Sequence, residues 1–140
     1  MSVINWIFLL LTILCWGVTP IIERYALNTV KPLDGLFIRS AGVFVIFLVF
    51  FVPTGRAKVV FDLPIKSIVF FLISGALAGF LGMYFYFHVL RANPSSKIVP
   101  LTATYPLITM FLSVAFLRED FSWQRVAGTI LIIIGIFLVK

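Results

Sequence analysis

Five long apolar stretches alternate with short polar connections along this chain. A helix that crosses the ~30 Å hydrocarbon core of a bilayer needs about 20 apolar residues, and lengths of about 17 to 25 are tolerated. The pattern therefore predicts an all-α polytopic membrane protein, a bundle of five transmembrane helices over residues 3–26, 36–52, 68–90, 98–117 and 123–139. Residues 1–140 are expected to form a single membrane domain, because the connections leave no room for a second one.

The composition supports a membrane protein and excludes several other classes. Hydrophobic residues make up 62% of the chain and charged residues 11%, whereas a typical soluble domain has about 45–50% and about 25%. The formal net charge is +6, but the cations lie mainly between the apolar stretches. They therefore indicate contact with membrane lipid and control of topology, and nucleic acid is not an expected partner.

The cations give almost no preference for one orientation in the membrane. Five spans place the two ends of the chain on opposite sides, with five cations on one side and five on the other, or six if Arg39 reaches the interface. A chain without a bias can insert both ways and pair as an antiparallel homodimer. The alternative is a fixed orientation set by lipid or by a partner subunit. The two sets are Arg56, Lys58, Lys66, Arg118 and Arg125, against Arg24, Lys31, Arg91, Lys97 and Lys140.

Polar and aromatic residues recur at helical spacing on three of the predicted helices. Polar groups are costly inside a bilayer, so each one needs a reason to be there. Converging stripes would line a substrate cavity; the alternative is that the hydroxyls bond to their own helix or join neighbouring helices. The candidate cavity residues are Trp16, Thr19, Tyr84, His88, Thr102, Tyr105 and Thr109.

Two prolines and four glycines indicate where helices bend or pack. Pro100 and Pro106 remove backbone donors from the fourth predicted helix, which favours a kink that frees carbonyl groups for another partner. A static bend is the alternative. Small residues let membrane helices approach closely. The predicted packing or dimer positions are Gly75, Gly79, Gly128 and Gly135.

Few titratable groups lie within the predicted spans. Arg39 either binds an anionic group or, as we favour, reaches the interface or pairs with Glu23 or Asp34. His88 either couples transport to protons or is an ordinary interfacial histidine, and we favour the second. The chain has no zinc-ligand spacing, phosphate-binding glycine loop or Ser-His-Asp arrangement. We predict no enzyme activity, no metal site and no cofactor.

The last three predicted helices carry motifs that resemble a known family. They read YFYFHVLR at residues 84–91, SSKIVPL at 95–101, YPL at 105–107, LRE at 117–119 and QRVAG at 124–128. Trp16-Gly17 and Arg39 add to the pattern. The chain resembles the EamA domain of the drug/metabolite transporter superfamily over nearly its whole length, most strongly over residues 84–138. His88 departs from the pattern, because the family more often has a small apolar residue there.

The resemblance implies a fold and a function. Most members carry two such domains as inverted halves of a ten-helix transporter, and this chain resembles a single half, like the five-span bacterial and archaeal transporters. The implied function is secondary transport of a small metabolite or drug-like solute, by export or exchange, in the cytoplasmic membrane of a prokaryote. The resemblance places five of the candidates at a central cavity: Trp16, Tyr84, Thr102, Tyr105 and Thr109.

We expect the working unit to be an antiparallel homodimer or a paired half-transporter that moves a small-molecule substrate by alternating access. Two other functions remain open. One is a non-transporting accessory or scaffold subunit that stabilises a membrane partner. The other is a component of a lipid-carrier flippase. The flippase interpretation predicts a side opening between helices with cationic contacts for a headgroup.

Overall fold

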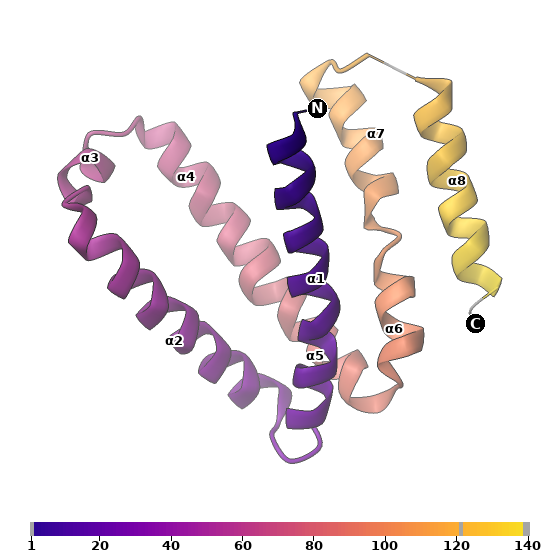
Figure 1. The fold of residues 1–140 in the computed structure, drawn as a ribbon, viewed down its shortest axis with the longest axis horizontal. Coiled ribbons are helices and arrows are strands. Elements are labelled where there is room, and N and C mark those ends of the chain that lie inside the picture. The colour runs from indigo at the N-terminus through magenta and orange to yellow at the C-terminus, as the bar shows by residue number, and fades with distance from the viewer. Residues whose placement is uncertain (1, 121, 139–140) are drawn as a thin grey trace. The chain divides into compact units, whose positions relative to one another are not determined.

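The computed structural model describes residues 2–120 and 122–138, and these residues form helices without any strand (Figure 1). The all-α prediction is thus confirmed. In chain order the elements are α1 (Val3–Ala26), α2 (Pro32–Phe51), the 3-10 turn η1 (Val52–Thr54), α3 (Ala57–Phe61), α4 (Ile65–Ser74), the π-helix η2 (Gly75–Gly82), α5 (Met83–Ala92), α6 (Ser95–Thr102), α7 (Tyr105–Leu117) and α8 (Trp123–Leu138).

The helices join into rods that are long and apolar enough to cross a membrane. Four such rods cover Val3–Ala26, Pro32–Thr54, Ile65–Ala92 and Ser95–Leu117, and Trp123–Ile136 is a shorter apolar helix. Nearly all the large apolar side chains on them are exposed, because their outer faces meet lipid rather than water. The chain is therefore a multi-pass helical membrane protein.

The described residues fall into two compact units, α1 to α5 and α6 to α8. In the first unit, α5 packs against α1 and α2 near the turn that joins them (Figure 1). Leu27, Leu36 and Phe87 are almost fully buried. Gly35 sits between two of them, since a Cβ there would lie 3.6 Å from Leu27 and 3.7 Å from Phe87. This cluster fixes the end of the first unit where α1 leads into α2.

Two rods of the first unit differ from the expected helices. The second begins at Pro32 rather than residue 36, because a proline at the first helical position loses no hydrogen bond and has a suitable φ angle. It ends at Gly55, whose φ of 65° suits glycine. A short helix, α3, then occupies part of the predicted connection. The third rod is divided by the π-helix η2, where three glycines weaken ordinary α-helical geometry.

The second unit is a helical hairpin whose first arm is interrupted. The chain leaves the helix at Ala103 and Thr104 and re-enters it at Tyr105, with Pro106 in the first turn of α7. α8 then runs back beside this arm (Figure 1). The connection turns at Arg118, which has a left-handed φ of 54°. Whether the whole chain behaves as a single domain stays a prediction.

Replacing Leu27 tests the packing of the first unit. Leu27 is 2% exposed, so Leu27→Ala leaves a cavity and is expected to lower the free energy of unfolding by roughly 2–5 kcal/mol. Leu14 is 64% exposed on α1, and Leu14→Ala should change it by about zero, because lipid is as apolar as the lost side chain. Unfolding in mixed micelles, followed by tryptophan fluorescence, measures both values. Equal losses for the two variants would contradict this packing.

Candidate functional site

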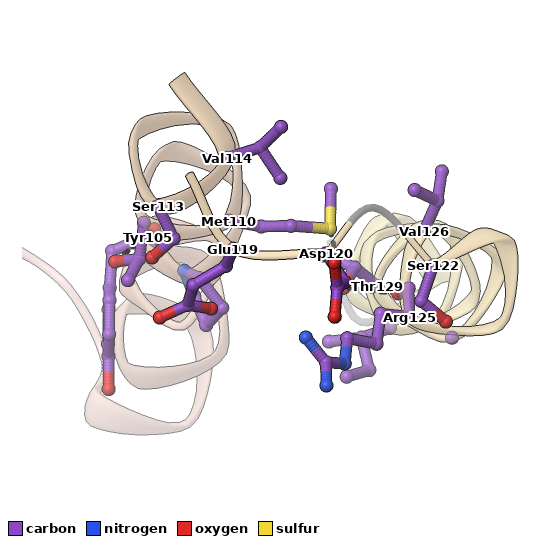
Figure 2. Close-up of a pocket in the computed structure, with 14 residues that line it drawn as sticks. Tyr105, Met110, Ser113, Val114, Glu119, Asp120, Ser122, Arg125, Val126 and Thr129 are labelled. Atoms are coloured by element: carbon purple, nitrogen blue, oxygen red, sulfur yellow. Dashed lines mark hydrogen bonds between the residues drawn. The ribbon is translucent and has the colours of Figure 1, made fainter. Parts of the chain in front are cut away.

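A groove of about 480 Å³ lies between α7 and α8 in the second unit, and it extends from their connection to Tyr105 at the start of α7. Short connections make consecutive membrane helices antiparallel neighbours, so polar residues near the turn come together (Figure 2). Tyr105, Pro106 and Thr109 of the sequence-predicted residues line it, together with Gly128. The other lining residues are Met110, Ser113, Val114, Glu119, Asp120, Ser122, Arg125, Val126, Thr129 and Ile132.

Several hydroxyl groups of this groove make contacts within the second unit. The Met110 side chain reaches from α7 toward α8 (Figure 2), and its Sδ lies 3.9 Å from the Thr129 hydroxyl. The same hydroxyl donates to the Arg125 carbonyl at 2.8 Å. Thr109 donates only weakly to the Tyr105 carbonyl, at 3.4 Å. Tyr105 itself is 57% exposed.

A second hollow of about 340 Å³ lies in the first unit, where α1, α2 and α5 meet. Thr19 is the sequence-predicted residue that lines it. Most of the wall is apolar, but it includes one charged pair, Glu23 and Arg39. The remaining lining residues are Ile22, Ala26, Leu27, Val30, Gly35, Ile38 and Phe87.

The charged pair joins α1 to α2 inside this hollow. Arg39 Nε lies 3.2 Å from Glu23 Oε1, so the pairing with Glu23, one of the alternatives left open by the sequence, is confirmed. Glu23 lies one turn from the end of α1, and Arg39 lies about two turns from the start of α2. Ionised groups at this depth are costly unless they are paired, which accounts for the contact.

Tyr84 and His88 stand together on α5. Their ring centroids are 4.4 Å apart, and His88 Nδ1 lies 2.8 Å from the Tyr84 carbonyl oxygen. A carbonyl only accepts, so Nδ1 carries the proton in this contact and Nε2 is the nitrogen left for another partner. His88 also lines a groove with two cations, Lys31 and Arg91. It therefore lies near the end of the span, as expected from the sequence.

Two of the remaining candidates, Thr19 and Thr102, donate hydrogen bonds to the backbone of their own helices. Thr19 donates to the Cys15 carbonyl at 2.7 Å. Thr102 donates to the carbonyls of Ile98 and Val99 at 3.1 and 2.9 Å. Such bonds to the preceding turn satisfy the hydroxyl without a neighbouring helix. Trp16 is 67% exposed on α1, one turn before Thr19.

The two prolines act differently. Pro100 lies inside α6, where it cannot donate to the carbonyl four residues earlier. Pro106 stands just after the break between α6 and α7. Near that break, the Ala103 amide and the Thr104 hydroxyl donate to the carbonyls of Val99 and Leu101. The helix is thus interrupted rather than merely bent, and local donors satisfy part of the exposed backbone.

The glycine positions have open faces. A Cβ built at Gly75, Gly79, Gly128 or Gly135 meets nothing within 4 Å among the described residues. The assignment of these four positions to helix packing or to a dimer contact stays a prediction.

The structure brings together some candidates and adds others. Tyr84 meets His88, Tyr105 and Thr109 share the α7–α8 groove, and Thr19 shares its hollow with the ion pair. Convergence of all seven candidates on one cavity stays a prediction. The missed groove residues include Met110 and Thr129, which look like ordinary packing residues in sequence. The short connection at residues 118–122 was the signal that α7 and α8 are neighbours.

Comparison with known proteins finds two archaeal relatives, one of which is named as a transporter. An uncharacterized transporter of Archaeoglobus fulgidus is 25% identical over 129 residues, which are 90% of this chain and 44% of that protein. An uncharacterized protein of Methanocaldococcus jannaschii is 33% identical over 75 residues, 54% of this chain and 55% of that protein. The chain thus spans about half the length of the curated relatives it matches. No solved structure matches it.

The family assignment follows from a match to almost the whole sequence. The profile of the EamA-like transporter family aligns with residues 4–140. This range includes all the apolar rods and both hollows, so the match is not restricted to a local motif. The chain belongs to the EamA-like transporter family.

Proposed function

We propose that the chain is one half of a secondary transporter that carries a small metabolite or drug-like solute across the cytoplasmic membrane of a prokaryote. Two copies pair in antiparallel orientation, or one copy pairs with a related half, and the pair works by alternating access. The observation that carries this proposal is the family match over residues 4–140. The transporter of Archaeoglobus fulgidus adds to it, because the 129 matched residues make up only 44% of that protein, which is therefore about twice as long as this chain.

Three features of the chain support pairing. Secondary transporters place their substrate sites between repeated halves near the middle of the bilayer, and two copies of this chain supply about the length of the Archaeoglobus fulgidus relative. The near-equal cation counts permit both orientations. The open faces at Gly128 and Gly135 on α8 offer close approach to a second polypeptide.

The groove between α7 and α8 is one part of the substrate route that each chain provides. Its mixture of an aromatic ring, hydroxyls and apolar wall is typical of small-molecule sites, which are mostly apolar with a few polar groups. Its volume of about 480 Å³ is also in their range of about 300–1,000 Å³. An accessory subunit needs no such groove.

Removing the Tyr105 ring should reduce transport without disturbing the fold. Tyr105 is 57% exposed and lines the groove, so Tyr105→Ala loses a ligand contact worth about 1 kcal/mol and slows flux by about fivefold to tenfold. Flux is measured in proteoliposomes, with the solute that most raises the Tm of the purified protein. Tyr25→Ala is the control, because Tyr25 is 82% exposed at the end of α1 and lines neither hollow.

Two outcomes would contradict this assignment. Wild-type flux in Tyr105→Ala would remove the groove from the route. Absence of flux for every solute that stabilises the wild-type protein would favour an accessory subunit instead.

A single added lysine should shift the orientation of the chain. A reporter at the C-terminus is expected on both sides of the membrane for wild type. Leu63→Lys adds a cation to the connection after α3 and should hold that connection in the cytoplasm, leaving the reporter outside. Lys58→Gln should have the opposite effect.

Asp62→Asn is the matched control for orientation. It changes the net charge of the same connection without adding a cation, and acidic residues contribute little to topology. A wild-type reporter found on one side only, and unmoved by Leu63→Lys, would refute dual insertion.

A further inference from the structure

We propose that Arg39 is the binding residue for a carboxylate-bearing solute, which enters the hollow between α1, α2 and α5 and displaces Glu23 from the guanidinium group. This inference rests on the proposed transport function and names its substrate class: a small monocarboxylate with an apolar body. The charged pair is then the resting state of an anion site.

The first argument is the incomplete use of the Arg39 guanidinium. Arginine offers five N–H donors in a planar fork and binds carboxylates best through two parallel hydrogen bonds. Arg39 Nε lies 3.2 Å from Glu23 Oε1, but Glu23 Oε1 accepts no properly aligned hydrogen bond in the described part of the protein. The strong two-bond arrangement is therefore not formed in this pair. A second carboxylate with free movement can form it.

The second argument is the position of the pair at the edge of a suitable hollow. The Arg39 side chain is 39% exposed, whereas the Glu23 side chain is 11% exposed. Arg39 is thus the more accessible member of the pair, and Glu23 is held against the protein. Both groups line a space of about 340 Å³, which is within the usual range of about 300–1,000 Å³ for small-ligand pockets.

The third argument is the character of the remaining wall. Apart from the pair and the Thr19 hydroxyl, the lining residues have apolar side chains or are glycine, with Ile22, Ile38 and Phe87 the bulkier members. The Thr19 hydroxyl already donates to the Cys15 carbonyl. Such a wall favours an apolar body and gives no second cation for a dianion. The best-matched ligand has one carboxylate and a compact hydrocarbon or aromatic group.

The fourth argument is that Arg39 keeps a carboxylate partner in both states. An unpaired charge at this depth is costly, and exchange of one carboxylate for another leaves that cost on the displaced Glu23 and not on Arg39. Glu23 is then an internal competitor whose removal should strengthen ligand binding. A purely structural pair makes the contrary prediction, since it has no ligand for Glu23 to compete with.

Titration calorimetry on the full chain, purified in a neutral detergent, tests the proposal with phenylacetate and benzoate. Phenylacetamide and benzamide have nearly the same shape without the charge. We expect the acids to bind wild type at least tenfold more tightly than the amides. Arg39→Gln should abolish that preference. Arg39→Lys keeps the charge but loses the planar fork and should weaken acid binding about tenfold.

The change in affinity for the acids in Glu23→Gln distinguishes an anion site from a purely structural ion pair. The substitution removes the competing negative charge and should tighten binding of the acids about tenfold, with the amides unchanged. Arg24→Gln is the matched control, because Arg24 lies beside Glu23 in sequence, binds Asn28 at 2.7 Å and does not line the hollow. It should bind the acids like wild type. If Glu23→Gln fails to fold, the Arg39→Lys result decides alone. Wild-type affinity for the acids in Arg39→Lys would refute the claim that the planar guanidinium group binds the carboxylate.

Several results would overturn the inference. Equal binding of acids and amides, or unchanged acid binding in Arg39→Gln, would exclude Arg39 as an anion site. Binding of phosphatidylglycerol in an Arg39-dependent manner, with no binding of phenylacetate or benzoate, would assign the hollow to a lipid phosphate and refute the solute class. The transport proposal can hold even if the carboxylate site is refuted. In that case an uncharged solute is still transported by Arg39→Gln.

Discussion

Every structural feature of this protein depends on one constraint: hydrocarbon offers no hydrogen-bond partner, so each backbone and side-chain polar group must be satisfied by the protein itself. Helices satisfy most of the backbone, and the hydroxyls of Thr19 and Thr102 bond to the preceding turn. Where Pro106 prevents a continuous helix, the Thr104 hydroxyl and the Ala103 amide donate to nearby carbonyls. Glu23 and Arg39 meet for the same reason.

The same constraint explains why the spans were predictable from the sequence. Apolar stretches of about 20 residues predict helical rods, because a helix satisfies its backbone hydrogen bonds within one segment. The first helix, Val3–Ala26, has the expected bounds. The second begins earlier, since Pro32 is favourable at a helix start although it was interpreted as part of the connection. The π-helix at Gly75–Gly82 was not predicted, because its five-residue bonding pattern has no periodic hydrophobic signature.

The candidate site was predictable only in part, and the reason is the short range of its interactions. Polar stripes located Tyr105 and Thr109 on the groove, but helical spacing alone cannot distinguish a cavity face from hydroxyls bonded to their own helix. Met110 lines the groove because α8 packs beside it and brings the Thr129 hydroxyl near its sulfur atom. This contact depends on tertiary packing and has no signal in the sequence around Met110. The contact of Glu23 with Arg39 was one of several pairings open to the sequence, and the geometry of the α1–α2 turn selected it.

The central claim is that a single copy of this chain is an incomplete route and that a pair is required. The most direct test measures two quantities in each single vesicle: the accumulation of solute, and the number of chains. The chains carry one dye each and are counted by stepwise photobleaching. The account predicts flux only in vesicles that hold at least two chains, and none where one chain is present. Flux at the full rate in vesicles with a single chain would contradict it.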